Sequence, residues 1–203
     1  MHHGPQIAQA QHLTTMSDGH MGDPVNIVLI GSEADLVNGM QATGWSPADP
    51  ITLETSLRIA AYSILRRPDP DAPVSDLFRF DRKQDLAFEQ PVGSSPRQRY
   101  HVRFWHWDRK DDGRPVWFGA ASFDERAGLS YTTGQVTHRI GTDVDAERDR
   151  IAGELGQSGC VAGTEWLDGF HPEREGRNGG GDVWRTDGRL AVLTLKTCRA
   201  AKP

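Results

Sequence analysis

The stretch of sequence that decides the fold class is Arg99-Tyr100-His101-Val102-Arg103-Phe104-Trp105. Apolar and polar side chains alternate along it, and a period of two is typical of a β-strand whose two faces meet different surroundings. The apolar face, which we expect to lie in the core, consists of Tyr100, Val102 and Phe104. The opposite face consists of Arg99, His101, Arg103 and Trp105. This second face is either a binding site for an anionic group or the solvated face of a half-exposed sheet.

Further strands surround this segment. Asp111-Asp112-Gly113 is a turn signal that favours a hairpin with the apolar strand 116–123. Short strands are predicted at 77–80 and 86–89, on either side of a polar turn at 81–84. Toward the C-terminus the pattern predicts one more strand and one more hairpin: 135–140, and 183–185 with 190–195.

Helices are predicted in three places. A buried strand at 25–30 leads into the first helix, for which Ser32 is the N-cap. Apolar residues at helical spacing predict a second helix over 53–64. The third helix begins at a capping residue, which is either Thr142 or Asp143.

These elements predict a single α+β domain over residues 23–198, with about three helices packed on a largely antiparallel or mixed sheet. Residues 1–22 contain no apolar core of a secretory signal and are predicted to be a disordered tail, and 199–203 a disordered end. The glycine-rich loop 169–182 lacks the Lys-Ser/Thr ending of a phosphate-binding loop. It is therefore predicted to be a flexible lid or linker.

The composition excludes several classes of function. The 203 residues include 23 Lys and Arg against 28 Asp and Glu, and the resulting net charge of −5 argues against general nucleic-acid binding. No apolar run approaches the roughly 18 residues of a transmembrane helix. The two cysteines, Cys160 and Cys198, exclude a four-cysteine zinc site and are expected to be reduced thiols in a cytoplasm.

A candidate catalytic set lies around His138, which acidic residues follow closely in the sequence. Asp143 and Glu147 are four residues apart and therefore neighbours on a helix. An imidazole beside two carboxylates can act as a general base without a cofactor, and His101 joins the set if its strand lies nearby. Alternatively, His101, His138 and Asp143 hold a divalent metal. In a purely structural interpretation, His138 is a core histidine and the acids complement the helix dipole.

One set of segments runs in order through most of the chain, from Pro24-Val25-Asn26-Ile27-Val28 to Asn178-Gly179-Gly180-Gly181-Asp182. Between them lie His101-Val102-Arg103-Phe104-Trp105, Arg114-Pro115-Val116-Trp117 and Asp143-Val144-Asp145-Ala146-Glu147-Arg148. In this order they resemble the bacterial LssY C-terminal-domain family, which has no established biochemical activity. Its members occur alone or attached to membrane proteins, including type 2 phosphatidic-acid phosphatases. The resemblance implies a membrane phosphatase-type partner or an anionic lipid, and a location in the cytoplasm or peripheral to the inner membrane.

The chain departs from the family's pattern in two respects. Relatives often carry paired histidines where this chain has Tyr100-His101 and His138-Arg139, so a metal site here would be incomplete. The Pro-Ser-Gly-His segment and the membrane helices of the phosphatase domain are not found in the sequence. Phosphatase activity is therefore not carried over to this chain.

Two hypotheses from different classes follow. The first is a binding or regulatory module that engages an anionic headgroup or a membrane-associated partner through Arg99, Arg103 and Trp105. The alternative is a small metal- or histidine-dependent hydrolase that acts on an ester or phosphoester with His101, His138, Asp143 and Glu147.

Overall fold

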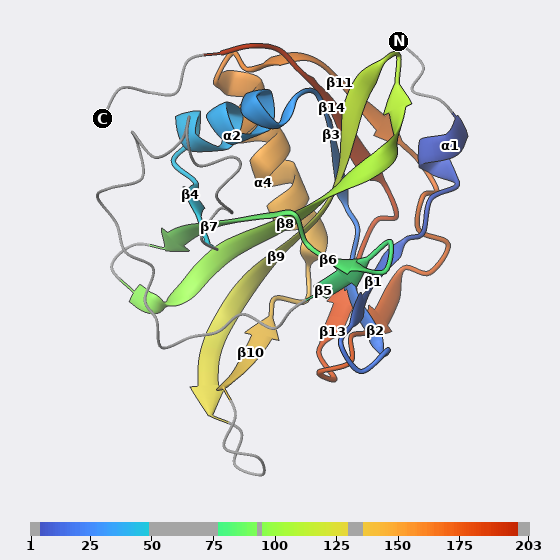
Figure 1. The fold of residues 1–203 in the computed structure, drawn as a ribbon. Helices are drawn as coiled ribbons and strands as arrows, with labels where there is room; N and C mark the ends of the chain where they lie inside the picture. Colours follow the sequence, from blue (N-terminus) through green and yellow to red (C-terminus); the bar gives the residue numbers. More distant parts are fainter. Residues whose placement is uncertain (1–4, 49–76, 93–94, 130–135, 199–203) are drawn as a thin grey trace.

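The computed structural model describes residues 5–48, 77–92, 95–129 and 136–198. Its main element is a large sheet with the strand order β11-β14-β3-β9-β8-β7-β4, and β10 pairs with β9 outside this path (Figure 1). The strands of the large sheet are β3 (Ile27–Ile30), β4 (Ser46–Pro47), β7 (Leu86–Val92), β8 (Ser95–Asp111), β9 (Arg114–Leu129), β10 (Val136–Ile140), β11 (Val161–Leu167) and β14 (Leu190–Leu195).

A small sheet with the order β2-β1-β5-β6 lies against the large one, and β12 and β13 form a separate ladder (Figure 1). The strands of these two sheets are β1 (Leu13–Met16), β2 (Met21–Pro24), β5 (Leu77–Arg79), β6 (Arg82–Lys83), β12 (Glu175–Arg177) and β13 (Val183–Arg185). The helices are α1 (Pro5–Ala8), α2 (Glu33–Ala42) and α4 (Val144–Gln157). None of the helices in the described residues is long and apolar enough to cross a membrane.

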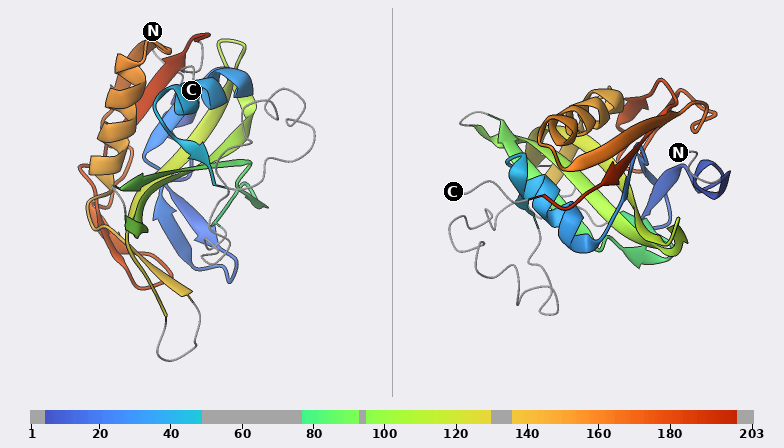
Figure 2. Two further views of the ribbon diagram at one scale, coloured as in Figure 1. Left: turned by 90° about the vertical axis from the view of Figure 1, so that its left-hand side faces the viewer. Right: turned by 90° about the horizontal axis from the view of Figure 1, so that it is seen from above.

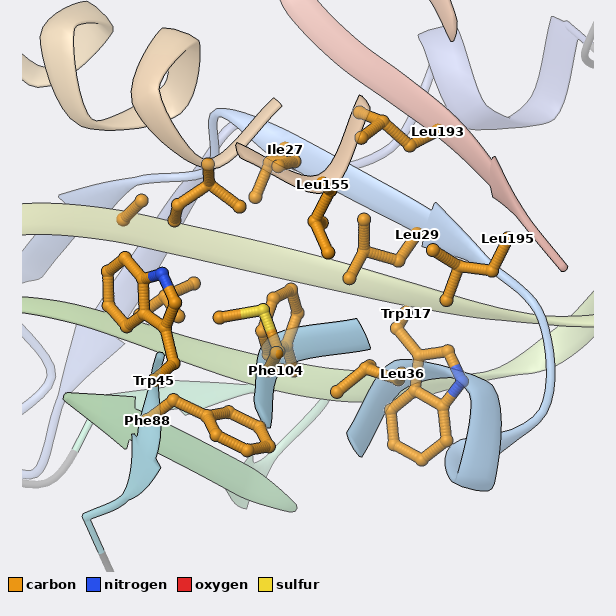
Figure 3. Close-up of a cluster of buried hydrophobic side chains, with 14 of the residues drawn as sticks. Ile27, Leu29, Leu36, Trp45, Phe88, Phe104, Trp117, Leu155, Leu193 and Leu195 are labelled. Carbon is orange, nitrogen blue, oxygen red and sulfur yellow. The ribbon is translucent and has the colours of Figure 1, made fainter. Parts of the chain in front are cut away.

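The layers of the molecule follow from the two faces of the large sheet. α2 and α4 lie together against one face, and the small sheet and α1 cover the other (Figures 1 and 2). Figure 3 shows Leu36 of α2 and Leu155 of α4 meeting Leu29 and Phe104 of the large sheet. On the far face, Ile7 of α1 packs with apolar residues of β3, β9 and β14.

The large sheet is mixed, as expected, because β14 and β3 are parallel while the other neighbours in it are antiparallel. In the part of the chain that the structure describes, far more residues lie in strands than in helices, so the α+β label fits loosely and sheet structure dominates. Three helices are found in the described residues. The helix expected over 53–64 lies outside the residues that the structure describes.

The hairpin expected from the central segment is confirmed. β8 and β9 pair from Arg99↔Asp124 to Asp111↔Arg114. Asp112 and Gly113, with φ angles of 48° and 73°, form the two-residue turn that matches the twist of a hairpin. The apolar face of β8 lies in the core, as predicted. Val102 and Phe104 are buried beneath the helices.

The predicted helix caps are present. Ser32 and Asp35 form a capping box at the start of α2, and Gly44 takes a positive φ of 84° just after its end. Asp143 rather than Thr142 is the N-cap of α4.

The prediction that residues 1–22 are a disordered tail is wrong for the residues from 5 onward. They form α1, β1 and the start of β2, and the domain therefore begins well before residue 23. Ile7 is only 1% exposed, and the backbone N–H of Val25 donates to the carbonyl of His12. One buried side chain and a backbone hydrogen bond are enough to fix this mostly polar segment on the fold. The amino-acid composition alone does not reveal such contacts.

The C-terminal third also differs from the prediction. β13 pairs with β12 and not with 190–195, which instead forms β14 between β11 and β3. β11 was not predicted, because Ala162, Gly163 and Thr164 interrupt its apolar pattern. The loop 169–182 contains β12 and is tied to the rest of the fold, as described below.

The two cysteines form a disulfide, which corrects the expectation of reduced thiols. Cys160 and Cys198 are joined, with their Cα atoms 5.0 Å apart. The bond connects the segment between α4 and β11 to the end of the chain beyond β14. Spacing could not predict the pairing, because it depends on β11 and β14 lying side by side.

Candidate functional site

The candidate site is a group of buried and half-buried polar side chains where the small sheet and the loop 178–182 meet the large sheet. We call it the polar cluster. Its members are Asp23, Glu89, Arg99, His101, Arg103, Asp124, Asn178 and Asp182. They come from β2, β7, β8, β9 and the loop 178–182, so the cluster exists only in the folded chain.

His101 lies at the centre of the polar cluster and is only 3% exposed. Its partners across the sheet are Glu89 on β7 and Ser122 on β9, and Asp124 follows on the same face of β9. The Nε2 atom of His101 is 3.7 Å from Oδ2 of Asp124 and 3.8 Å from Oε2 of Glu89. The imidazole is therefore placed between two carboxylates from the two neighbouring strands.

Arg99 joins the same two carboxylates. Its Nη1 atom donates to Oε2 of Glu89 at 3.0 Å, and its Nε atom is 3.9 Å from Oδ2 of Asp124. Strand pairing explains this arrangement, because Arg99 and Asp124 are directly opposite in the β8–β9 ladder. The guanidinium of Arg99 is thus already engaged by carboxylates of the protein.

Arg103 and Asp23 connect the large sheet to the small one. Both residues are only 6% exposed. Burial raises the pKa of Asp23 above its ordinary value, and the nearby positive charge of Arg103 opposes this rise. The negative charges of Asp124 and Asp182 raise the pKa of Asp23 further, and a hydrogen bond from Asn178 Nδ2 at 3.1 Å lowers it.

The loop 178–182 is held in place by its own hydrogen bonds. Asn178 Oδ1 accepts from the backbone N–H of Asp182 at 3.0 Å, and Oδ2 of Asp182 accepts from the backbone N–H of Ile140 at 3.2 Å. The backbone N–H of Gly179 donates to the carbonyl of Met21 at 2.7 Å. These bonds tie the loop to β10 and β2, so the prediction of a flexible lid or linker is wrong.

A small cavity adjoins the polar cluster. Its volume is about 10 Å³, which is room for one water molecule, and its lining includes Gln84, His101 and Arg103. The imidazole and the guanidinium thus border a space where a single polar molecule fits.

The predicted ligand-binding residues share one face of β8, but the face is neither open nor solvated. Arg99 is half-buried, Arg103 is buried, and Trp105 is fully buried against Leu77 and Ala120. The indole Nε1 of Trp105 donates to the carbonyl of Arg82 at 3.3 Å. Trp105 is therefore a core residue that the small sheet covers. The sequence pattern had predicted either an anion-binding face or a solvated face here, and neither includes a buried tryptophan.

The structure separates the acids of the predicted catalytic set from His101. Asp143 caps α4, where its side chain accepts from the backbone N–H groups of Asp145 and Ala146. Glu147 lies on α4, the helix that packs against the opposite face of the large sheet. Burial raises the pKa of Glu147 to about 7, with Arg150 opposing the rise.

His138 is placed only through its backbone. It pairs with Ala127 of β9, five residues beyond Ser122, the partner of His101. Five residues of a strand span about 17 Å, and β10 and β8 lie on opposite sides of β9. No group of His, Cys, Asp and Glu in the described residues has the geometry of a metal site.

Sequence reasoning missed five of the eight residues of the polar cluster, since among these it named only Arg99, His101 and Arg103 as site residues. Asp23 was assigned to the start of order, Glu89 was predicted only as part of a strand, and Asp124 lay just beyond the strand predicted at 116–123. The one available signal was strand pairing: once β8 is paired with β7 and β9, Glu89 and Asp124 fall beside His101 and Arg99. The pairing of β7 with β8 could not be predicted from the sequence pattern.

Comparison with known proteins gives one match. A family model described as the LssY C-terminus matches residues 7–190. The matched region contains every residue of the polar cluster and begins within α1, in agreement with an ordered N-terminal segment. No curated protein and no solved structure matches the chain.

Proposed function

The chain belongs to the family of the LssY C-terminus, and on that premise we propose that it is a binding and regulatory module centred on the polar cluster. The observation that carries the proposal is the position of His101, buried between the carboxylates of Glu89 and Asp124. Buried charged groups contribute little to stability compared with apolar packing, so a cluster of this size favours a functional role.

The charge balance of the polar cluster indicates which kind of charge it binds. Four carboxyl groups face two guanidinium groups, so the cluster has more acid than base when His101 is neutral. Added positive charge reduces this excess, and the ring of His101 is the group that can accept it as a proton. A cationic group of a partner would be favoured by the same excess of negative charge.

The regulatory element of the proposal is the junction between the two sheets. Asp23 and Asn178 belong to the covering layer, whereas His101, Arg103 and Asp124 belong to the large sheet. A change of charge at His101 alters the attraction between these layers. We expect it to change how tightly β2 and the loop 178–182 dock on the large sheet.

An anionic headgroup at Arg99 and Arg103 is not favoured by this geometry. Arg99 lies 3.0 Å from Glu89, and Arg103 lies near Asp23, so carboxylates of the chain already occupy the place of an anion. A membrane phosphatase-type partner or an anionic lipid stays a prediction from the family resemblance alone. In liposome flotation, an Arg103→Ala variant should keep any lipid binding of the wild-type chain, since Arg103 is buried.

The experiment that tests the regulatory proposal follows backbone amides by NMR while the full chain is acidified from pH 8 to pH 5. We expect the amides of Gly179 and Asp182 to shift together in the wild type and to stay in place in a His101→Gln variant. His106→Gln, in the same strand, is the matched control and should behave as the wild type. Amides that move equally in the His101→Gln variant would contradict the proposal.

A second candidate function, a hydrolase, rests on the water-sized cavity beside His101 and Arg103. A histidine held by carboxylates can take a proton from a water molecule that attacks an ester or phosphoester. Its residue set is then His101 with Glu89 or Asp124, and not Asp143 or Glu147.

A panel of generic ester and phosphoester substrates tests the hydrolase, together with elemental analysis of the purified chain for a divalent metal. Turnover that His101→Gln abolishes, and His106→Gln leaves unchanged, would support hydrolysis. A flat response of the wild type across the panel would exclude it for these substrates.

A further inference from the structure

Arg79 is a buried cation that lies outside the polar cluster. It ends β5 and is 1% exposed. The central carbon of its guanidinium lies 4.7 Å from the centre of the Phe80 ring and 4.4 Å from that of Phe118. The guanidinium therefore lies against two aromatic rings, which meet each other edge to face with their centres 6.0 Å apart, and each ring attracts a cation.

The hydrogen bonds of Arg79 are incomplete on one side. Its Nη1 atom donates to the carbonyl of Gln11 at 2.6 Å. Its Nε and Nη2 atoms are buried and have no partner in the part of the chain that the structure describes. These two N–H groups are parallel within the guanidinium plane. Together they form the fork that binds a carboxylate or phosphate with two parallel hydrogen bonds.

The charge of Arg79 is also uncompensated. Among the described residues no carboxylate forms an ion pair with it, in contrast to Arg99 and Arg148. Burial lowers the pKa of Arg79 to about 10, so the group is still charged at neutral pH. Burying a charge without an ionic partner is unfavourable, and an anion bound at the fork would offset that cost.

The turn after Arg79 gives a second, independent indication. Phe80 and Asp81 have φ angles of 54° and 58°, and together they connect β5 to β6. Such a turn is usually made by Asn-Gly, and a bulky residue with positive φ is strained. The strained residue is the one whose ring covers the guanidinium, and strain of this kind gathers at ligand-binding positions.

We propose that Arg79 is the centre of an oxyanion-binding site, which takes a carboxylate or phosphate group on its Nε–Nη2 fork beside the rings of Phe80 and Phe118. This proposal goes beyond the one made for the polar cluster and does not depend on it, because the two sites share no residue.

Access to Arg79 runs through the N-terminal segment. Gln11, whose carbonyl accepts from Arg79, lies between α1 and β1, and the next residue is His12. β1 pairs with β5 only at Thr15↔Phe78 and Met16↔Leu77. An anion therefore reaches the fork only when the segment before Leu13 lifts away and the buried Ile7 leaves the core, a movement that leaves the β1–β5 ladder unbroken.

The test is the thermal unfolding of the full chain in increasing phosphate, with chloride at matched ionic strength as the reference. Binding to the native state raises the midpoint, by about 3–5 °C when phosphate is tenfold above its Kd. Acetate should act in the same way if a carboxylate also fits. A soluble short-chain phosphatidic acid distinguishes a lipid headgroup from free phosphate, because a headgroup site responds to it at lower concentration.

The variants separate binding at Arg79 from general effects of salt. Arg79→Met should abolish the response, Arg79→Lys should weaken it because lysine has no fork, and the exposed Arg109→Met should keep it. If Arg79→Met does not fold, Arg79→Lys and the NMR signal of the wild-type Arg79 Nε–H in phosphate decide the question. A wild type that responds to none of the anions, or an Arg79 variant that responds fully, would overturn the proposal.

Discussion

Glu147 is a buried carboxyl group, 5% exposed, on a helix that packs against the large sheet. Its Oε2 atom has no hydrogen-bond partner among the described residues. Its pKa is raised to about 7, chiefly by burial, compared with about 4.5 for an ordinary glutamate. The folded chain therefore holds a proton on Glu147 that the unfolded chain releases between about pH 4.5 and pH 7. The contribution of the protonated group to stability is complete below pH 4.5 and is lost as the pH rises through 7.

Replacing Glu147 by Gln should increase stability at high pH only. At pH 8.5 we expect Glu147→Gln to raise the free energy of unfolding by about 1–2 kcal/mol, which is less than the full pKa shift corresponds to because the glutamine amide is itself buried. At pH 5 the variant and the wild type should be nearly equal. Denaturant unfolding at both pH values checks this, with the exposed Glu173→Gln as control, and an equal gain at pH 5 would show that the pKa is not raised.

Single residues also show where sequence reasoning succeeds. The alternation around Val102 and Phe104 predicted the core face of β8, because the period of a strand is a local property. Whether the opposite face of β8 is buried or solvated depends on the packing of Leu77 against Trp105, and Leu77 lies far away in the sequence. No local pattern carries that information, and so the burial of Arg103 and Trp105 was not predicted.

At the scale of elements, variants of Asp143 test whether this acid is a helix cap or a ligand of the candidate site. As the N-cap of α4, its side chain accepts hydrogen bonds from two backbone N–H groups. Asp143→Ala should lower the free energy of unfolding by about 1 kcal/mol, and Asp143→Asn should restore most of it, because asparagine caps as well as aspartate. Urea denaturation measures both, and a loss with Asp143→Asn as large as with alanine would point to a role that needs the charge.

Elements were predicted best where they carry their own end signals. Ser32 with Asp35, Asp143, and the Asp112-Gly113 turn mark boundaries by local chemistry, and all three boundaries are found in the structure. Strand partners are a different matter, since they follow from the packing of the whole sheet. The sequence pattern therefore predicted a hairpin of 190–195 with 183–185. In the structure 190–195 is β14, which lies between β11 and β3.

At the scale of the whole molecule, the disulfide ties the end of the chain to the fold. The bond joins residues 38 positions apart, and closing a loop of this length stabilises the native state by about 3–4 kcal/mol in the chain-entropy model. A Cys160→Ser/Cys198→Ser variant should lose a stability of this order, and the wild type should lose the same amount when reduced. Thermal unfolding with and without reductant measures both effects.

The same bond bears on where the chain matures. Disulfides persist in oxidising compartments and are rare in the cytosol, so the bond favours an oxidising compartment over the expected cytoplasmic one. Thiol titration of the denatured native protein should find no free thiol, and two after reduction. Two free thiols before reduction would remove this argument.

The central claim is that the polar cluster responds to positive charge on His101, and a double-mutant cycle tests it most directly. Unfolding free energies are measured for the wild type, His101→Gln, Asp124→Asn and the double variant, at pH 5.5 and at pH 8.5. We predict a coupling of about 1–2 kcal/mol at pH 5.5 and less than about 0.5 kcal/mol at pH 8.5, because only a charged imidazole is attracted by the carboxylate of Asp124. A coupling that is the same at both pH values would contradict the claim.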